Sequence, residues 1–147
     1  MKKLLVGLLL ACCVTSVQSA EDKIGSWYLV SDTAAFTPAL NTNSSAVSVQ
    51  RLDEKLVIAV MGDFEECLPM NTSGQVINKS LAFSNTVTLD GMLKCRSGKE
   101  KTDMWYPKGT TNSLLLNALL TGDKYLTIGT SVYASEGYSD VVDKINK

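Results

Sequence analysis

Apolar and polar residues alternate along most of the chain beyond residue 20, a pattern that predicts β-strands with one buried face. The clearest alternation covers 86–95, where the apolar positions are Val87, Leu89, Leu93 and Cys95 and the polar positions are Thr86, Thr88, Asp90 and Lys94. This pattern places Cys95 on the buried face of the strand. Within the run, Asp90-Gly91 is expected to form a bulge or a tight turn, because glycine adopts conformations that other residues avoid.

Other segments have the same strand character. The expected strands cover 26–30, 46–52, 56–61, 75–83 and 125–134, and a hairpin turn is expected at 53–55. Residues 56–61 are continuously apolar, which indicates a central strand that is covered on both faces. Lys79 interrupts the inward set of 75–83. In 125–134 the inward positions are expected to be Leu126, Ile128, Val132 and Ala134.

Two segments have helical signals. The apolar run 114–120 follows the capping residues 111–113 and precedes Gly122, which suits the position after a helix. Near the C-terminus one stripe of an amphipathic helix consists of Tyr138, Val141, Val142 and Ile145. The sequence therefore predicts a mainly β fold, a compact antiparallel β-sandwich or open barrel with two short helices. It predicts one β-rich domain over 21–147, since no repeat or linker divides the chain.

Residues 1–20 have the organisation of a secretory signal peptide. Lys2 and Lys3 precede a short apolar run, and small residues up to Ala20 suit cleavage just before the charged residues begin. In the alternative processing, cleavage before Cys12 would make this cysteine a lipid anchor. We favour the first because the apolar run before Cys12 is unusually short. The brief basic start is typical of bacteria, so we expect a periplasmic or secreted protein. No later apolar stretch approaches the about 20 residues that a membrane-spanning helix needs.

The composition argues against several classes of function. Removal of the signal peptide leaves a net charge of −3 without a basic stripe, so nucleic acid is not an expected partner. The chain has no histidine, which removes Ser-His-Asp and Cys-His catalysis and histidine-bound zinc. Glu65 and Glu66 are more typical of a solvated edge than of a catalytic carboxylate pair. We therefore expect no enzymatic activity, no cofactor and no metal site.

Cys67 and Cys95 are the cysteines that remain after cleavage of the signal peptide. An even pair in an oxidising compartment indicates a disulfide. A reactive thiol would need a Cys-x-x-Cys pair or a nearby histidine, and the sequence has neither. We therefore predict a structural disulfide between the two.

The segment 96–109 combines positive charge with aromatic residues. The candidate binding surface consists of Arg96, Lys99, Lys101, Trp105, Tyr106 and Lys108. Exposed aromatic rings framed by positive charge suit recognition of an acidic protein surface or of a glycan. In the alternative interpretation, the segment is a long hairpin whose Trp105 folds back to cover an edge of the core.

Several landmarks occur in a characteristic order: Trp27 in the opening strand, 87–91 followed closely by Cys95, the apolar run 114–120, and Gly137-Tyr138 before the last helix. In this order the chain resembles the invasion-associated locus B family of small exported bacterial β-sandwich proteins, from residue 27 to about residue 145. The resemblance implies a non-enzymatic accessory protein linked to host-cell interaction and transfers no catalytic residues. The chain departs from the family pattern because a second cysteine is expected near Cys95, whereas the partner here is Cys67.

The leading hypothesis is an exported, non-enzymatic binding or accessory protein of the bacterial envelope, related to virulence, whose partner is another protein or a glycan. The alternative is a periplasmic inhibitor of lysozyme or another hydrolase. Such inhibitors are small, exported and disulfide-bonded, and a negative net charge would assist the encounter with a basic lysozyme.

Overall fold

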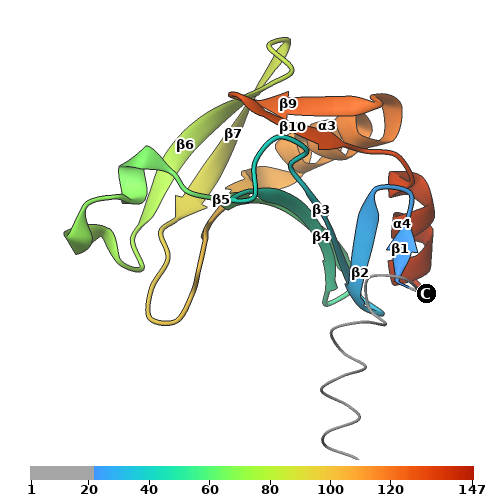
Figure 1. The fold of residues 1–147 in the computed structure, drawn as a ribbon, viewed down its shortest axis with the longest axis horizontal. Coiled ribbons are helices and arrows are strands. Elements are labelled where there is room, and N and C mark those ends of the chain that lie inside the picture. The colour runs from blue at the N-terminus through green and yellow to red at the C-terminus, as the bar shows by residue number, and fades with distance from the viewer. Residues whose placement is uncertain (1–21) are drawn as a thin grey trace, which may run out of the picture.

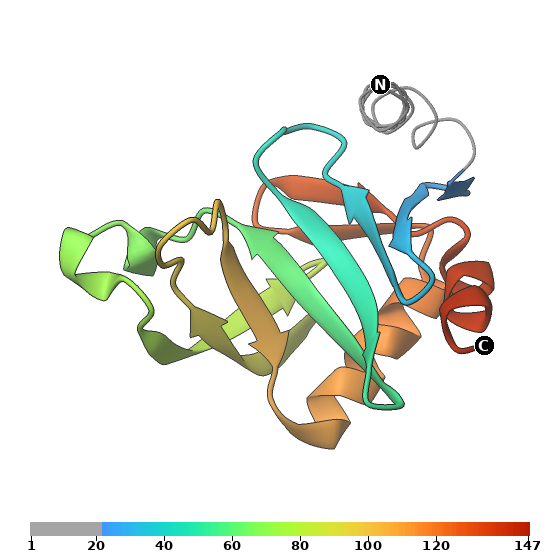
Figure 2. The same cartoon turned by 90° about the horizontal axis from the view of Figure 1, so that it is seen from below.

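The computed structural model describes residues 22–147 (Figure 1, Figure 2). The strands are β1 (Lys23–Ile24), β2 (Trp27–Ser31), β3 (Ala34–Pro38), β4 (Ala46–Leu52), β5 (Lys55–Gly62), β6 (Val76–Phe83), β7 (Val87–Lys94), β8 (Asp103–Pro107), β9 (Tyr125–Ile128) and β10 (Ser131–Ala134). They form one ten-stranded antiparallel sheet in the order β1-β2-β3-β4-β5-β8-β7-β6-β9-β10. The short 3-10 helices η1 (Glu65–Cys67) and η2 (Met70–Thr72) connect β5 to β6. The predicted signal peptide, with Cys12, lies outside the described residues.

The sheet curls until its β10 edge returns to the end of β3. The backbone of Ala39, just after β3, forms an isolated antiparallel bridge with Tyr133. The buried hydroxyl of Thr37 donates a hydrogen bond to Ala134 O at 3.1 Å. The protein is therefore mainly antiparallel β, as predicted, and of the two expected architectures it has the open barrel made of a single sheet.

Two helices pack against the barrel, as predicted. α3 (Gly109–Gly122) lies against β5, β7, β8 and β9, and it buries Leu116 and Leu120. α4 (Tyr138–Ile145) buries Tyr138, Val141 and Ile145, which confirms the predicted stripe. α3 begins earlier than the capping residues indicated. Asn112 lies inside the helix, where its amide links two segments by donating to Lys108 O and accepting from Asp90 N.

The core contains two tryptophans that are fully buried. The ring of Trp27 lies 5.2 Å from that of Tyr138 in α4, and the ring of Trp105 lies 5.6 Å from that of Phe83 in β6. Tilted aromatic pairs at such distances add favourable energy to the burial of their surface. The first pair joins the N-terminal strands to α4, and the second joins β8 to β6.

The β4–β5 hairpin confirms two expectations. Asp53 and Glu54 form its turn with φ values of 47° and 65°, as the type I′ turns of tight hairpins require. In the middle of β5, Ile58, Ala59 and Val60 are all buried although their side chains alternate between the faces. The middle of the strand is therefore covered on both faces, whereas Met61 further along the outer face stays half-buried.

Gly91 does not form the expected bulge or tight turn. It pairs regularly with Lys79 of β6 and Pro107 of β8 in the middle of β7. The indole of Trp105 lies directly over it, because a Cβ added at Gly91 would stand only 2.1 Å from Trp105 Cε2. Glycine is needed here for close packing and not for a turn.

The segment 125–134 forms a hairpin and not a single strand. Residues 129–130 make the turn between β9 and β10, so Leu126 pairs with Tyr133 and faces the core with it. Cross-strand partners share one face of a sheet, and the two-residue turn therefore moves the odd positions of β10 inward. The prediction for Leu126 holds, but Tyr133 occupies the core position that was expected for Val132.

The edge of β6 is largely unpaired within the described residues, because this strand meets β9 at a single pair, Phe83 with Ile128. Lys79 points to the inward face of this open edge and forms an ion pair with Glu66 of η1. Inward-pointing charges at exposed edges are a common protection against pairing with another chain. The charge that interrupts the apolar pattern of 75–83 thus has a structural explanation.

Candidate functional site

The base of the 96–102 loop, between β7 and β8, is fastened by a disulfide. Cys67 in η1 and Cys95 at the end of β7 are bonded with an S–S distance of 2.02 Å. Cys95 lies on the buried face, as the alternation predicted, so the bond ties the connection between β5 and β6 to the end of β7, an interior strand of the sheet.

Arg96 forms an ion-pair cluster next to this disulfide. Its Nε donates to Asp103 Oδ1 at 3.0 Å, its Nη2 contacts Asp63, and its Nη1 donates to Lys101 O at 2.7 Å. Asp103 is 1% exposed and also accepts hydrogen bonds from the N–H groups of Arg96 and Phe64, at 2.9 and 3.0 Å. Arg96 was expected to contact a partner. Its guanidinium instead binds Asp63, Asp103 and the carbonyl of Lys101 and so holds the two ends of the loop together.

These contacts set the charge of both groups. Burial raises the pKa of Asp103, but the hydrogen bonds from the side chain and backbone of Arg96 and from Phe64 outweigh burial and hold this pKa below its usual value. The hydrogen bond to Asp103, and then that to Asp63, raises the pKa of Arg96 above its usual value. Both groups are ionised at neutral pH.

Asp103→Asn is expected to lower the free energy of unfolding at pH 7 by about 2 kcal/mol, because Arg96 loses a charged partner. The pKa of Asp103 is lowered in the folded state, so its contribution is complete above the unfolded value of about 3.9 and is lost as the pH falls through the folded value. Urea unfolding at pH 7 and at about pH 3 measures the difference. The exposed Asp143→Asn is the control, and equal effects of the two substitutions at pH 7 would contradict this role.

The tip of the 96–102 loop presents free cations. Glu100 Oε1 accepts hydrogen bonds from the N–H and the hydroxyl of Ser97, both at 3.0 Å, so the loop is organised from within. Lys99 and Lys101 are exposed and form no ion pair with any described residue. Of the predicted surface, these two lysines remain available to a partner.

Trp105 belongs to the core, and the prediction that it forms part of a binding surface is wrong. Its side chain is fully buried, and its Nε1 donates to Lys79 O at 2.7 Å. The alternative interpretation, in which this ring covers the core, is the one observed. Tyr106 is the next residue on β8, so it lies on the opposite, outer face of the sheet, where it is partly exposed.

Tyr106 is one of several large apolar residues on the outer face. The set, which we call the outer sheet surface, consists of Tyr28, Phe36, Met61, Met92, Met104 and Tyr106, all half-buried. Strand register places them in two neighbouring rows. One row follows Lys23, Tyr28, Phe36, Ser48 and Ala59. Tyr106 and Met92 come next in this row, because Val60 and Trp105, the residues that adjoin Ala59 and Tyr106, are paired. The other follows Pro38, Ala46, Met61, Met104 and Lys94.

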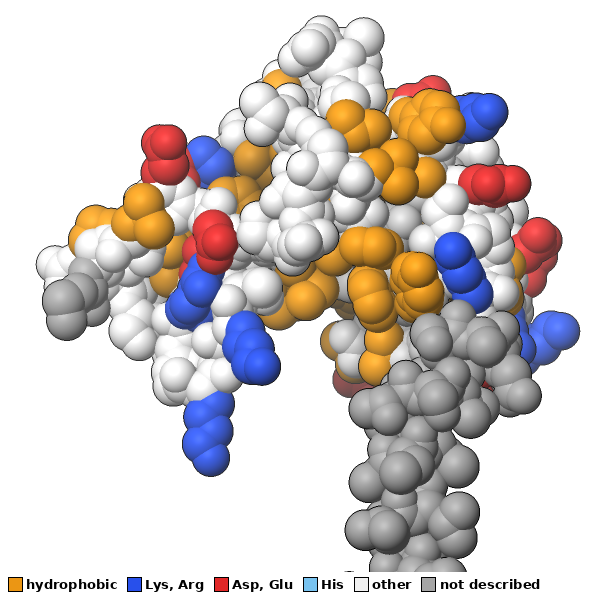
Figure 3. All heavy atoms as spheres, in the orientation of Figure 1, with side chains coloured by type: hydrophobic (Ala, Val, Ile, Leu, Met, Phe, Trp, Pro, Cys, Tyr) orange, Lys and Arg blue, Asp and Glu red, His pale blue; other side chains and the backbone are white. Residues whose placement is uncertain are grey.

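The outer sheet surface is hollow. β4 and β5 arch over it, and the 96–102 loop stands at one side (Figure 1). Figure 3 shows hydrophobic side chains gathered under this arch, with Lys and Arg side chains at the rim. The rings of Tyr28 and Phe36 stack at 5.5 Å, and the hydroxyl of Tyr106 lies 3.3 Å from Met104 Sδ. Burial, and to a lesser extent Glu100, raises the pKa of Tyr106, so its hydroxyl is neutral at physiological pH.

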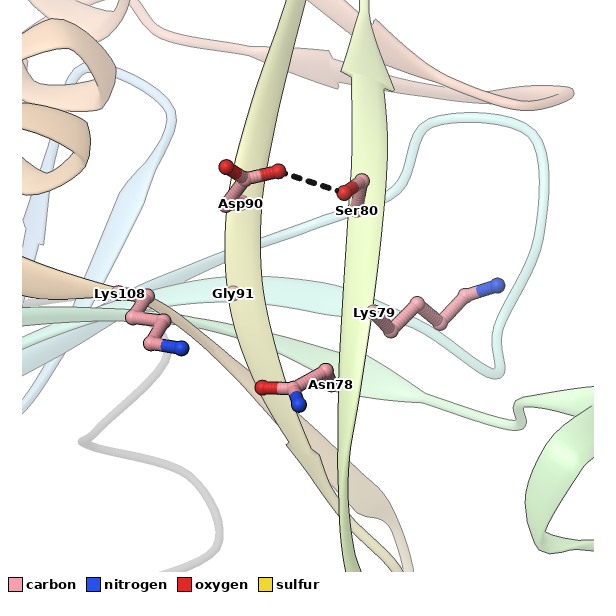
Figure 4. A pocket seen from close by; sticks show the side chains of 6 residues that line it. All are labelled: Asn78, Lys79, Ser80, Asp90, Gly91 and Lys108. Atoms are coloured by element: carbon pink, nitrogen blue, oxygen red, sulfur yellow. Dashed lines mark hydrogen bonds between the residues drawn. The ribbon is translucent and has the colours of Figure 1, made fainter.

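A small polar pocket adjoins this surface on β6 and β7. It has a volume of about 190 Å³ and is lined by Asn78, Lys79, Ser80, Asp90, Gly91 and Lys108 (Figure 4). Ser80 donates to Asp90 Oδ1 at 2.7 Å. Lys108, the last member of the predicted surface, therefore lies at this pocket and not at the loop with Lys99 and Lys101.

Sequence reasoning missed most of the outer sheet surface, although a signal was present. Met92 occupies a polar position of the 86–95 alternation, and Met104 and Tyr106 share one parity on β8. Large apolar residues at the solvent-facing positions of several strands indicate that the outer face of the sheet is also apolar.

Neither a metal centre nor a membrane span is found in the part of the chain that the structure describes. No group of at least three His, Cys, Asp or Glu residues within 22–147 is arranged to hold a metal ion. Over the same residues, no helix has the length and apolar character needed to cross a membrane.

Comparison with protein-family models gives no match for this chain. A search of curated proteins gives no match. A search of solved structures gives none either. The resemblance to the invasion-associated locus B family therefore stays a prediction from the sequence.

Proposed function

We propose that this chain is an exported, non-enzymatic accessory protein of the bacterial envelope that binds another protein through the outer sheet surface. The observation that carries this proposal is the hollow apolar face, because the core on the other side of the sheet is already filled by Trp27, Trp105 and their neighbours. An apolar patch of this kind on a soluble domain commonly marks an interaction site. Export rests on the N-terminal pattern, and a role at the host cell rests on the family resemblance.

The chemistry of the surface favours a protein partner over a glycan. Met, Tyr and Phe are enriched in the buried centres of protein interfaces. Methionine is flexible and polarisable, so Met61, Met92 and Met104 can adapt to the shape of a partner. A glycan would need a dense set of polar groups, and these lie outside the apolar rows, at Asn78 and Asp90.

The described groups with shifted pKa values support binding in preference to catalysis. Strongly shifted groups often mark active sites, but structural ion pairs shift pKa values as well. Asp103 is held by Arg96 at the loop base, and Glu66 is held by Lys79 at the β6 edge. Each of these carboxylates is engaged in holding two segments together.

Photo-crosslinking tests the proposal in the native compartment. A benzoyl-phenylalanine at Tyr106 is expected to give a discrete adduct with a partner protein, because this position lies within the outer sheet surface beside Met92 and Met104. The matched control carries the same group at Tyr125, an exposed tyrosine on β9 that lies beside Lys124, three strands away from β8 in the sheet. We expect at least about tenfold more adduct from position 106. Equal adducts from both positions, or turnover of a substrate by the purified protein, would overturn the proposal.

The 96–102 loop gives a specific reason to keep the hydrolase inhibitor as a second candidate. The loop is fastened at its base by the disulfide and Arg96, and its tip presents Lys99 and Lys101. A rigid cationic loop suits the paired carboxylates in the cleft of a glycosidase. Identification of a hydrolase as the crosslinked partner, together with slower cell-wall lysis when the protein is added, would favour this candidate.

A further inference from the structure

We infer that the segment recognised by the outer sheet surface is an acidic, amphipathic segment of the partner protein. The inference rests on the proposed function and adds the chemistry of the ligand. Its basis is the distribution of lysines around the apolar rows.

Each of the two rows has a lysine at one end, and the two lysines stand at opposite ends of the surface. Lys23 pairs with Tyr28 at the first end, and its Nζ lies 5.0 Å from the centre of the Tyr28 ring. Lys94 pairs with Met104 at the other end, on β7. Lys99 and Lys101 follow Lys94 on the adjoining loop. A ligand seated on the apolar residues would therefore have cations at its two ends.

The nearby acids offset this positive charge only in part. Asp63 and Asp103 share the single positive charge of Arg96, so this cluster adds one net negative charge beside the four lysines of the rim. Glu100 receives two hydrogen bonds from Ser97, and its other oxygen lies 3.8 Å from Lys94 Nζ. Lys23, Lys99 and Lys101 form no ion pair with any residue in 22–147. The rim is thus locally positive on a chain whose net charge is negative.

The separation of the cations decides the size of the ligand. From β1 to β7 the sheet order crosses six strand spacings of about 4.8 Å, a path of roughly 29 Å along the curved sheet. A small anion or a single lipid headgroup is too short to reach both ends. A protein segment with apolar residues in its middle and carboxylates towards its ends reaches both and covers the methionines between them.

Two designed peptides test this inference directly. Both are helix-forming, about 18 residues long, with the same leucine stripe; one carries glutamate and the other lysine on the polar face. The mature protein carries ¹³C-labelled methionine methyl groups. We expect the glutamate peptide to shift the signals of Met61, Met92 and Met104, and to bind at least about tenfold more tightly than the lysine peptide. Its affinity is expected to fall at least about fivefold between about 50 and 500 mM salt.

Charge variants give the matched control. The triple variant Lys94→Ala, Lys99→Ala and Lys101→Ala is expected to weaken binding of the glutamate peptide at least about tenfold. The same number of lysines is removed from another part of the surface in Lys124→Ala, Lys144→Ala and Lys147→Ala, and this control is expected to bind as the wild type does. All six side chains are exposed, so both triple variants are expected to fold.

Several results would overturn the inference: equal binding of the two peptides, equal loss in both triple variants, or no binding of the glutamate peptide at about 1 mM. Binding to anionic phosphatidylglycerol vesicles without binding to the peptide would assign the surface to a membrane instead. Methionine shifts that depend on protein concentration alone would assign it to a second copy of the chain. These failures can be distinguished from failure of the proposed function. If the variant with Lys94, Lys99 and Lys101 replaced still captures the crosslinked partner as the wild type does, protein binding stands and the inference of an acidic segment is rejected.

Discussion

Replacement of Gly91 by alanine is expected to destabilise the protein by about 3 kcal/mol, a large cost for one added methyl group. The new Cβ would lie 2.1 Å from Cε2 of Trp105 and 2.3 Å from its Nε1. Non-bonded carbon atoms prefer about 3.5–4.0 Å, so the indole must move. Its movement would break the hydrogen bond to Lys79 O and disturb the contact with Phe83. Urea unfolding at neutral pH measures the loss.

A double-mutant cycle identifies the cause. Trp105→Ala alone is expected to cost about 3–5 kcal/mol through the cavity that it leaves. In that background the added methyl group has space, so Gly91→Ala is expected to cost less than about 1 kcal/mol. Gly122→Ala is the matched control, because no atom lies within 4 Å of a Cβ at this helical position. If Gly91→Ala costs the same with and without Trp105, the close packing is not the reason for the glycine.

The positions that are buried in the core can be predicted from the local pattern of apolar and polar residues. Leu89, Leu93 and Cys95 are buried as their alternation predicts, and the α4 stripe is buried as its periodicity predicts. In both cases the side-chain period of the element decides which face meets the core. The need for a glycine at position 91 could not be predicted in this way. It depends on Trp105, which reaches over β7 from the neighbouring strand β8 although 14 residues separate the two in sequence.

The candidate site was predicted less completely for a related reason. Charged side chains are usually exposed, so the sequence was sufficient to expect Lys99 and Lys101 at the surface. It could not show that Arg96 is held by Asp63 and Asp103, because these partners are brought to it by the fold. Trp105 and Tyr106 are neighbours in the sequence and point to opposite faces of β8. Only the pairing of β8 between β5 and β7 decides which of the two rings joins the core. It also brings Met61, Met92 and Met104 together on the outer face.

Removal of the disulfide is the other change with a large expected effect. The double variant Cys67→Ser and Cys95→Ser is expected to lose roughly 3–4 kcal/mol of stability, because the sequence separation of 28 residues sets the entropy that the bond removes from the unfolded chain. Reduction of the wild type is expected to give the same loss, whereas a reductant is expected to leave the serine variant unchanged. Urea unfolding with and without dithiothreitol measures both effects.

The loss should also be uneven along the chain, because the bond lies beside the Arg96–Asp103 pair. Without it, η1 can separate from the end of β7, and the N–H groups of Phe64 and Arg96 are expected to lose their hydrogen bonds to Asp103 more often. Hydrogen exchange at these two amides should therefore accelerate more than exchange at Val49 and Ile58 in the β4–β5 hairpin. Equal acceleration at all four amides would contradict the idea that the disulfide holds η1 against the end of β7. It would mean that the bond acts only on the unfolded chain and not on the loop that carries Lys99 and Lys101.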